Sequence, residues 1–280
     1  MEIYNPKKHT SEPSTTPSNQ PIKGSIFPER ALNKGLPFYV KISFFLIGFL
    51  GLQLFSILVQ LFISLFLSLD ENRTLFLSLL NFFTYLLTAI GMLSLLSFEP
   101  HRGIKILGKE FLDKKAYGYA AIGLFAIYLV NIIFSLLYSM IPYYGSNANQ
   151  DAVESMTASQ PVLLFFTTVI FAPFCEELTY RVGLGDTIGR KNPWLGIILS
   201  SLIFGLIHFD FNSISNVISS VDTELYEANL INLYNELLNL PIYVFSGAVL
   251  CSTYFFSGRL SSSMSAHLCN NLLSFIVSTI

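Results

Sequence analysis

The sequence predicts an all-α protein, a polytopic transmembrane bundle of about seven to eight helical spans. Of its 280 residues, 52% are hydrophobic and only 12% are charged, and the mean hydropathy is +0.56. Soluble domains usually contain about a quarter charged residues, so this chain is too apolar to be one. The apolar residues also occur in runs of roughly 20 or more, the length with which a helix crosses a bilayer.

Short polar segments separate these apolar runs. We expect spans at residues 38–69, 74–98, 116–142, 161–190, 192–209, 242–258 and 260–280. The first run is longer than a bilayer requires, which implies a tilted helix. The acidic segment 210–241 has leucines and a tyrosine at helical spacing, which indicates an amphipathic helix in the outer interface. An eighth or re-entrant piece in this segment is the alternative.

The chain divides into three parts by composition. Residues 1–36 are polar and predict a disordered cytoplasmic tail, residues 37–142 form N-terminal transmembrane helices, and residues 143–280 contain the polar motifs described below. Lys and Arg concentrate in the tail and in the loop 99–115, which predicts that both lie on the cytoplasmic side of the cell membrane. The loop 143–160 has no Lys or Arg, as an outer loop should. The near-neutral charge argues against nucleic-acid binding.

The three cysteines all lie in apolar runs, at Cys175, Cys251 and Cys269. Their odd number and apolar surroundings predict buried thiols rather than disulfides. A cysteine protease is disfavoured, because neither Cys175 nor Cys269 has a cation at a spacing that would stabilise a thiolate.

Three charged residues lie within the run that begins at Pro161: Glu176, Glu177 and Arg181. A charged side chain at mid-bilayer costs about 2.5 to 3.5 kcal/mol on insertion scales, so such residues indicate a functional site. On a helix, Glu177 and Arg181 form a favourable pair four residues apart, and Glu176 lies about 100° around the axis. We therefore expect a structural Glu177–Arg181 ion pair and a free Glu176 carboxylate. The alternative is an ion cluster that only fixes helix packing.

Two further polar pairs occur at helical spacing in apolar runs. Phe204 and His208 are four residues apart, as are His267 and Asn271. If spans four and five form a hairpin, Glu176 lies about 21 Å and His208 about 24 Å from its turn at 1.5 Å per residue, so they share one depth. His267 and Asn271 project from one face of another helix. Phe204 is expected to be a packing residue.

A carboxylate, two imidazoles and a carboxamide can together hydrolyse an amide bond. Glu176 would activate water, and His208 and His267 would position or protonate the reacting groups. The Asn271 amide would hold the developing oxyanion. Each residue also has a structural explanation when taken alone. His208 could be a hydrogen-bonded core residue, and Asn271 could form a hydrogen bond between helices.

In this order, the motifs Glu176-Glu177-xxx-Arg181, Phe204-xxx-His208 and His267-xxx-Asn271 resemble those of the CPBP family, also called Abi. This family contains the type II CAAX prenyl endopeptidases and bacteriocin-processing enzymes, which are intramembrane proteases. The resemblance covers about residues 160–280, and nothing in the first 115 residues resembles the family. The ordered set is specific, although each motif alone is weak.

The resemblance implies a role for each motif residue and makes the segment 143–280 a protease core. Glu176 would be the general base, His208 and His267 would assist it, and Asn271 would contribute to the oxyanion hole. Glu177 and Arg181 would brace the site.

The resemblance further implies an endopeptidase that acts on peptides or proteins at the lipid bilayer. CAAX-type, pheromone, bacteriocin and surface-protein processing all remain open. The competing hypothesis is a non-catalytic immunity or scaffold protein that binds a peptide or protein partner in the same cavity. A transporter is disfavoured, because no internal repeat is visible.

The family was long described as zinc metalloproteases, and a zinc ion here would have Glu176, His208 and His267 as ligands. The sequence has no HExxH motif, and a glutamate that binds metal cannot easily also act as the base. We therefore expect metal-independent catalysis without a cofactor, with a zinc endopeptidase as the alternative.

One expectation conflicts with this arrangement. If the last span begins at Leu260 on the cytoplasmic side, His267 lies only about 10 Å deep, whereas Glu176 and His208 lie deeper. At least one expected span boundary or membrane side must therefore be incorrect. The segment 210–241 is the first candidate.

Overall fold

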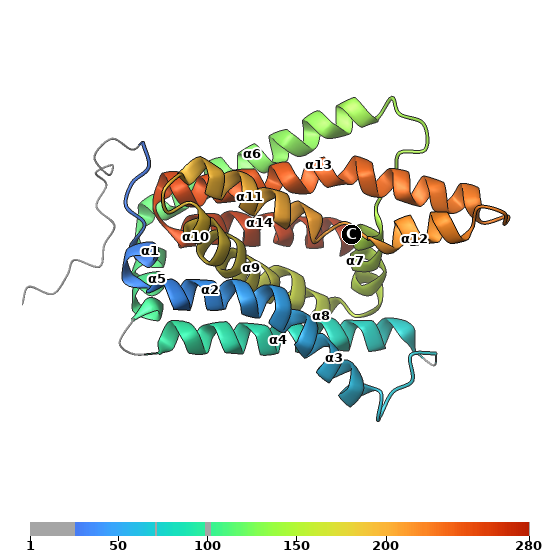
Figure 1. Ribbon diagram of the computed structural model, residues 1–280, viewed down its shortest axis with the longest axis horizontal. Coiled ribbons are helices and arrows are strands. Elements are labelled where there is room, and N and C mark those ends of the chain that lie inside the picture. Colours follow the sequence, from blue (N-terminus) through green and yellow to red (C-terminus); the bar gives the residue numbers. More distant parts are fainter. Residues whose placement is uncertain (1–25, 71, 99–101, 280) are drawn as a thin grey trace, which may run out of the picture.

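The computed structural model describes residues 26–70, 72–98 and 102–279, and their regular structure is helical throughout. The prediction of an all-α fold is confirmed. Figure 1 shows the long helices lying roughly along one axis. With π-helices labelled η, the elements are α1 (Ala31–Gly35), α2 (Phe38–Leu46), η1 (Ile47–Gly51), α3 (Leu52–Ile63), α4 (Arg73–Ser97), α5 (Gly103–Leu112), α6 (Lys114–Tyr138), α7 (Ala148–Ser159), α8 (Pro161–Leu164), η2 (Phe165–Phe171), α9 (Ala172–Glu176), η3 (Glu177–Gly185), α10 (Asp186–Ile188), α11 (Pro193–Leu206), α12 (Asn212–Ser219), α13 (Tyr226–Ser257) and α14 (Leu260–Thr279).

Among the described residues, five helical segments are long and apolar enough to cross a membrane. They are Phe38–Ile63, Arg73–Ser97, Lys114–Tyr138, Pro161–Ile188 and Tyr226–Ser257. The helix α11 is apolar but shorter, and α14 does not belong to the five. The protein is therefore a multi-pass membrane protein, and the total of seven to eight spans remains a prediction.

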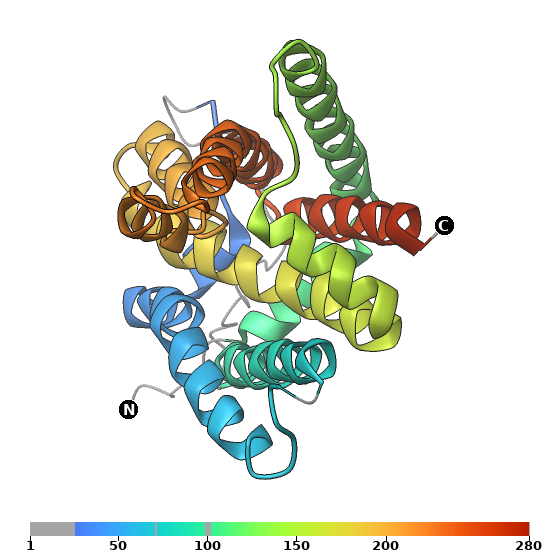
Figure 2. The same cartoon turned by 90° about the vertical axis from the view of Figure 1, so that its right-hand side faces the viewer.

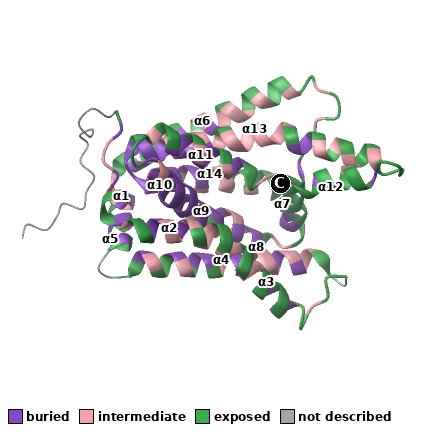
Figure 3. Cartoon of the chain, in the orientation of Figure 1, coloured by how far each residue is buried: buried purple, intermediate pink, exposed green. Residues whose placement is uncertain are grey.

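The segment Pro161–Ile188 forms the centre of the bundle. In its most apolar window 56% of the residues are buried, against 17% in Phe38–Ile63 and in Lys114–Tyr138. Figure 3 shows the buried residues gathered along α9 and α10. Two stretches of this segment, η2 and η3, are π-helical, a conformation that often marks functional sites. Their wider turns shorten the segment, so the depths calculated from an α-helical rise are too large.

Close packing between α2 and η3 depends on a glycine. A Cβ atom added to Gly183 would lie 2.7 Å from the backbone nitrogen of Phe45. Small residues at membrane helix interfaces let two backbones approach in this way. The first span is thereby held directly against the segment that contains Glu177.

The end of the predicted tail belongs to the folded bundle. Phe27 and Leu32 are buried, and the Arg30 guanidinium lies 2.5 Å from the Asp186 carboxylate at the end of the central segment. Tyr254 on α13 donates to the other oxygen of Asp186 at 2.6 Å. The prediction of a disordered tail is therefore wrong for residues 26–36, and residues 1–25 lie outside the described part of the chain.

Two further segments differ from the prediction. The outer loop 143–160 contains the helix α7. The helix α13 runs without interruption through Pro241, so the expected sixth span starts well before residue 242. The segment 210–241 holds α12 and the first half of α13 as ordinary helices.

The two ends of the bundle differ in charge. The end formed by α1, α5 and α10 in Figure 1 carries most of the basic residues: Lys34, Arg102, Lys105, Lys109, Lys114, Lys115, Arg190, Lys191 and Arg259. The opposite end, formed by α7 and α12, carries Asp70, Asp151, Glu154, Asp210, Asp222, Glu224 and Glu227. Within the described ranges, Arg73 is the basic residue at that acidic end. Figure 2 views the bundle from this end, with α7 lying across it.

Candidate active site

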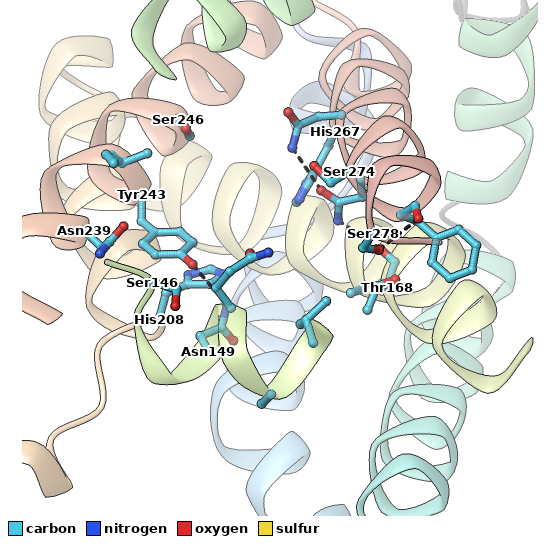
Figure 4. A pocket seen from close by; sticks show the side chains of 18 of the residues that line it. Ser146, Asn149, Thr168, His208, Asn239, Tyr243, Ser246, His267, Ser274 and Ser278 are labelled. Carbon is cyan, nitrogen blue, oxygen red and sulfur yellow. Dashed lines mark hydrogen bonds between the residues drawn. The ribbon is translucent and has the colours of Figure 1, made fainter. Parts of the chain in front are cut away.

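One cavity of about 840 Å³ brings the predicted site residues together. Glu176, His208, His267 and Asn271 all line it, and Figure 4 shows side chains from several helices facing this space. We call it the chamber. The helices that carry the motifs do not line it alone, because α4, α6 and α7 also contribute lining residues.

Glu177 lies at the centre of a buried polar cluster. The Nε–H of Arg181 donates to its Oε2 at 3.2 Å, and Nη2 of Arg181 lies 3.1 Å from Oε1. The Nδ1 of His267 lies 3.0 Å from the same Oε1. The predicted ion pair is therefore present. Since Nδ1 donates to the carboxylate, Glu177 also fixes the orientation of the His267 ring, a contact that the sequence did not indicate.

Glu176 lies beside this cluster and lines the chamber. Its Oε2 is 3.7 Å from Nε2 of His267. The hydroxyl of Tyr85 on α4 donates to Oε1 at 3.3 Å. The expectation of a free carboxylate is therefore wrong, because Tyr85 provides a hydrogen-bond donor from a distant helix. The contact between His267 and the adjacent glutamates also removes the predicted conflict in depth.

His208 is held by Phe204 and Tyr243. Because a carbonyl oxygen can only accept, Nδ1 of His208 donates to the Phe204 carbonyl, at 2.7 Å. The ring stacks on Tyr243 with centroids 4.5 Å apart and an interplanar angle of 12°. The Tyr243 hydroxyl accepts from Asn149 of α7 at 3.2 Å. The neutral His208 ring therefore presents Nε2 as an acceptor.

Phe204 packs against both histidines, as expected of a packing residue. Its ring centroid lies 4.9 Å from that of His208 and 5.9 Å from that of His267. The Arg181 guanidinium lies over the same ring at 4.7 Å, an arrangement that stabilises a cation. Phe204 thus separates the two imidazoles at a fixed spacing.

Asn271 is positioned by two hydrogen bonds. Its Nδ2 donates to the Thr168 carbonyl at 2.9 Å, and its Oδ1 accepts from Asn270 at 3.1 Å. A carboxamide nitrogen has two hydrogens, so one N–H of Asn271 remains for a ligand in the chamber. Thr168 belongs to η2, so the π-helical turns help to orient this group.

Among the chamber residues that sequence reasoning missed, Asn270, Tyr85 and Tyr243 contact the predicted site residues. Asn270 was visible as the neighbour of Asn271, but its contact with Asn271 could not be inferred. Tyr85 and Tyr243 lie in apolar runs without a motif, so no spacing distinguished them from packing residues.

Glu176, His208 and His267 are of the residue types that bind zinc. Among the described residues, no group of three His, Cys, Asp or Glu side chains has a metal-binding arrangement. The orientation of His267 by a carboxylate is nevertheless one that zinc ligands often have. Independence from metal therefore stays a prediction. The three cysteines are free thiols, with Cys175 and Cys251 buried.

The fold and the chamber together define a multi-pass membrane protein whose cavity brings a carboxylate, two imidazoles and a carboxamide together. Residues 158–273 match the family described as type II CAAX prenyl endopeptidase Rce1-like. This segment contains all three motifs, and the resemblance to the CPBP family is thereby confirmed. The match supports an intramembrane protease.

Two relatives align with part of the chain. The UPF0177 protein YvdC of Lactococcus lactis subsp. lactis is 28% identical over 127 residues, which cover 44% of this chain and 47% of that protein. An uncharacterized protein of Mycoplasma capricolum subsp. capricolum is 31% identical over 105 residues, which cover 35% of this chain and 31% of that protein. The alignments thus span less than half of either relative. No solved structure matches the chain significantly.

Proposed function

We propose that the protein is an intramembrane endopeptidase that hydrolyses peptide bonds with water activated by Glu176. The observation that carries this proposal is the convergence of Glu176, His208, His267 and Asn271 on one chamber from three parts of the chain. Hydrolysis inside a membrane requires a space for water and polar groups around it, and the chamber has both properties.

The contacts suggest how the reaction proceeds. Glu176 takes a proton from water as the water oxygen bonds to the carbonyl carbon of the substrate. The carbonyl oxygen becomes an oxyanion, which the remaining N–H of Asn271 stabilises. The peptide C–N bond then breaks as the leaving nitrogen receives the proton from Glu176. His208 accepts a hydrogen bond from the water through Nε2 and so orients it.

The remaining residues position the base. Glu177 and Arg181 hold the ring of His267 beside Glu176. The hydroxyl of Tyr85 fixes the rotamer of the Glu176 carboxylate through Oε1. Proton transfer of this kind contributes about 10²- to 10⁴-fold to rate when the groups are aligned.

Metal-independent catalysis is part of the proposal. The contacts of Glu176 leave its carboxylate available as a base beside His267, which supports this assignment. In a zinc endopeptidase, the alternative, Glu176, His208 and His267 would instead be ligands and Asn271 would polarise the carbonyl.

We place the protein in the cell membrane with its N-terminal tail in the cytoplasm. The concentration of basic residues at the end formed by α1, α5 and α10 supports this orientation. The partners are then the lipid bilayer and a peptide or membrane-protein substrate, without nucleic acid.

The experiment that tests the function compares peptides from cells that carry the wild type or Glu176→Gln. Mass spectrometry of membrane and secreted fractions should reveal new peptide ends that occur only with the wild type. A non-catalytic immunity or scaffold protein would bind partners without creating such ends. Equal peptide profiles from the two strains, at equal protein levels, would favour that alternative.

A further inference from the structure

The chamber lies at the acidic end of the bundle, away from the basic residues. The helix α7, which has no Lys or Arg, contributes Asn149 and Gln150 to the lining, and Ser278 near the end of α14 lines it as well. The basic side chains gather at the other end, around α5 and the turn between α10 and α11. Lys and Arg mark the cytoplasmic side of membrane proteins. The chamber is therefore closer to the non-cytoplasmic surface.

The lining of the chamber mixes apolar and polar side chains and is almost uncharged. Carboxamides reach it from five helices, for example Asn81 on α4, Asn131 on α6, Asn149 on α7, Asn239 on α13 and Asn270 on α14. Glu176 is the carboxylate among the described lining residues, which include no Lys or Arg. A carboxamide both donates and accepts hydrogen bonds, as does each peptide unit of a substrate.

Asn131 has an unused acceptor in this wall. Its Oδ1 is buried and makes no hydrogen bond within the described part of the chain. A buried polar atom without a partner costs about 1 to 3 kcal/mol, so a ligand that supplies an N–H would be favoured there. A peptide backbone has such donors and needs no lipid chain to supply them.

We propose that the substrate is an exported polypeptide segment without a lipid modification, which enters the chamber from the non-cytoplasmic side. This inference rests on the proposed peptidase function and specifies its substrate class. It separates the exported peptides and surface proteins from the prenylated cytoplasmic proteins that the sequence alone left equally open.

Cysteine labelling in intact cells tests the side of entry independently of catalysis. Ser155→Cys places a thiol on the exposed face of α7, and Lys114→Cys places one at the basic end. With a membrane-impermeant maleimide, Ser155→Cys should label at least tenfold more than Lys114→Cys until the cells are permeabilised. The wild type controls for Cys175, Cys251 and Cys269. The reverse pattern would overturn the proposed side.

A peptide assay tests the chemistry of the substrate. Purified wild type and Glu176→Gln are given a synthetic decapeptide library and a matched library that ends in a farnesylated CAAX sequence. The unmodified library should be cleaved at least tenfold faster, and only by the wild type. Faster cleavage of the farnesylated library would overturn the substrate class. If neither library is cleaved, the proposed peptidase function fails, and the labelling result still reports the side.

Discussion

At the scale of single residues, the two adjacent glutamates differ through their neighbours. The spacing of Glu177 and Arg181 predicted their ion pair, because side chains four apart on a helix meet. The partners from other helices could not be predicted. Tyr85 is 91 positions from Glu176 in the sequence, and His267 is 90 from Glu177, so only the tertiary fold brings them together.

Substitution of Tyr85 tests whether its hydroxyl positions the base. Tyr85→Phe removes one hydrogen bond to a carboxylate, worth about 1.5 to 3 kcal/mol, so kcat/KM should fall roughly 10- to 100-fold. Tyr119→Phe on the exposed face of α6 is the matched control. An unchanged kcat/KM for Tyr85→Phe would assign Tyr85 a packing role only.

Glu177 is expected to matter for stability more than Glu176. Glu177→Gln leaves the buried Arg181 without a counter-charge, which costs about 3 to 5 kcal/mol when one partner of a buried pair is lost. Glu176→Gln keeps the shape of a side chain that faces the chamber and should change the melting temperature much less. Melting of both variants in detergent measures the difference. A larger decrease in melting temperature for Glu176→Gln would show that Glu176, and not Glu177, has the structural role.

At the scale of helices, hydropathy predicted where most elements lie but not their internal geometry. Apolar runs mark α4, α6 and α14 within a few residues, because lipid contact selects apolar side chains. The π-helical turns of η2 and η3 leave no composition signal, since they result from packing around the site. The folding of residues 26–36 was also missed, because its Arg30–Asp186 contact joins distant parts of the chain.

The contact of α2 with η3 can be tested at a glycine. Gly183→Ala places a methyl group 2.7 Å from the Phe45 nitrogen, so the helices must separate and the variant should lose about 1 to 3 kcal/mol of stability. Gly118→Ala on α6 is the control, because its added Cβ has no atom within 4 Å. Thermal unfolding of both variants in detergent measures this. Equal melting temperatures would show that the contact does not constrain the fold.

At the scale of the whole molecule, the site depends on both halves of the chain. The motif-containing half was predicted from its spacing, but α4, α6 and α7 also line the chamber. Their polar contributions are amides, a serine and a tyrosine, which no local pattern separates from ordinary interhelical polar residues. The first half therefore supplies part of the site rather than only a membrane anchor.

The stability of the assembled bundle should depend on pH through Glu110 at its basic end. This residue of α5 is 1% exposed, and its Oε2 accepts from the Ser261 N–H at the start of α14. Burial raises the pKa of Glu110 to about 8. The folded state therefore holds a proton that the unfolded chain releases near its ordinary pKa, and stability falls as pH rises from about 4.5 to about 8.

Glu110→Gln should remove this part of the pH dependence, because the amide keeps an acceptor and cannot ionise. Melting temperatures measured from pH 5 to pH 9 should decline less steeply in this variant than in the wild type. Parallel curves for the two proteins would show that Glu110 does not contribute to the pH dependence of stability.

The central claim is that Glu176 activates water for peptide hydrolysis. The most direct measurement is the cleavage rate of the unmodified decapeptide library by purified, chelator-treated wild type and Glu176→Gln. We expect the stripped wild type to cleave and Glu176→Gln to be slower by about 10²- to 10⁴-fold, the contribution of a general base. Equal rates for the two proteins, or activity of the wild type that returns only with zinc, would contradict the account.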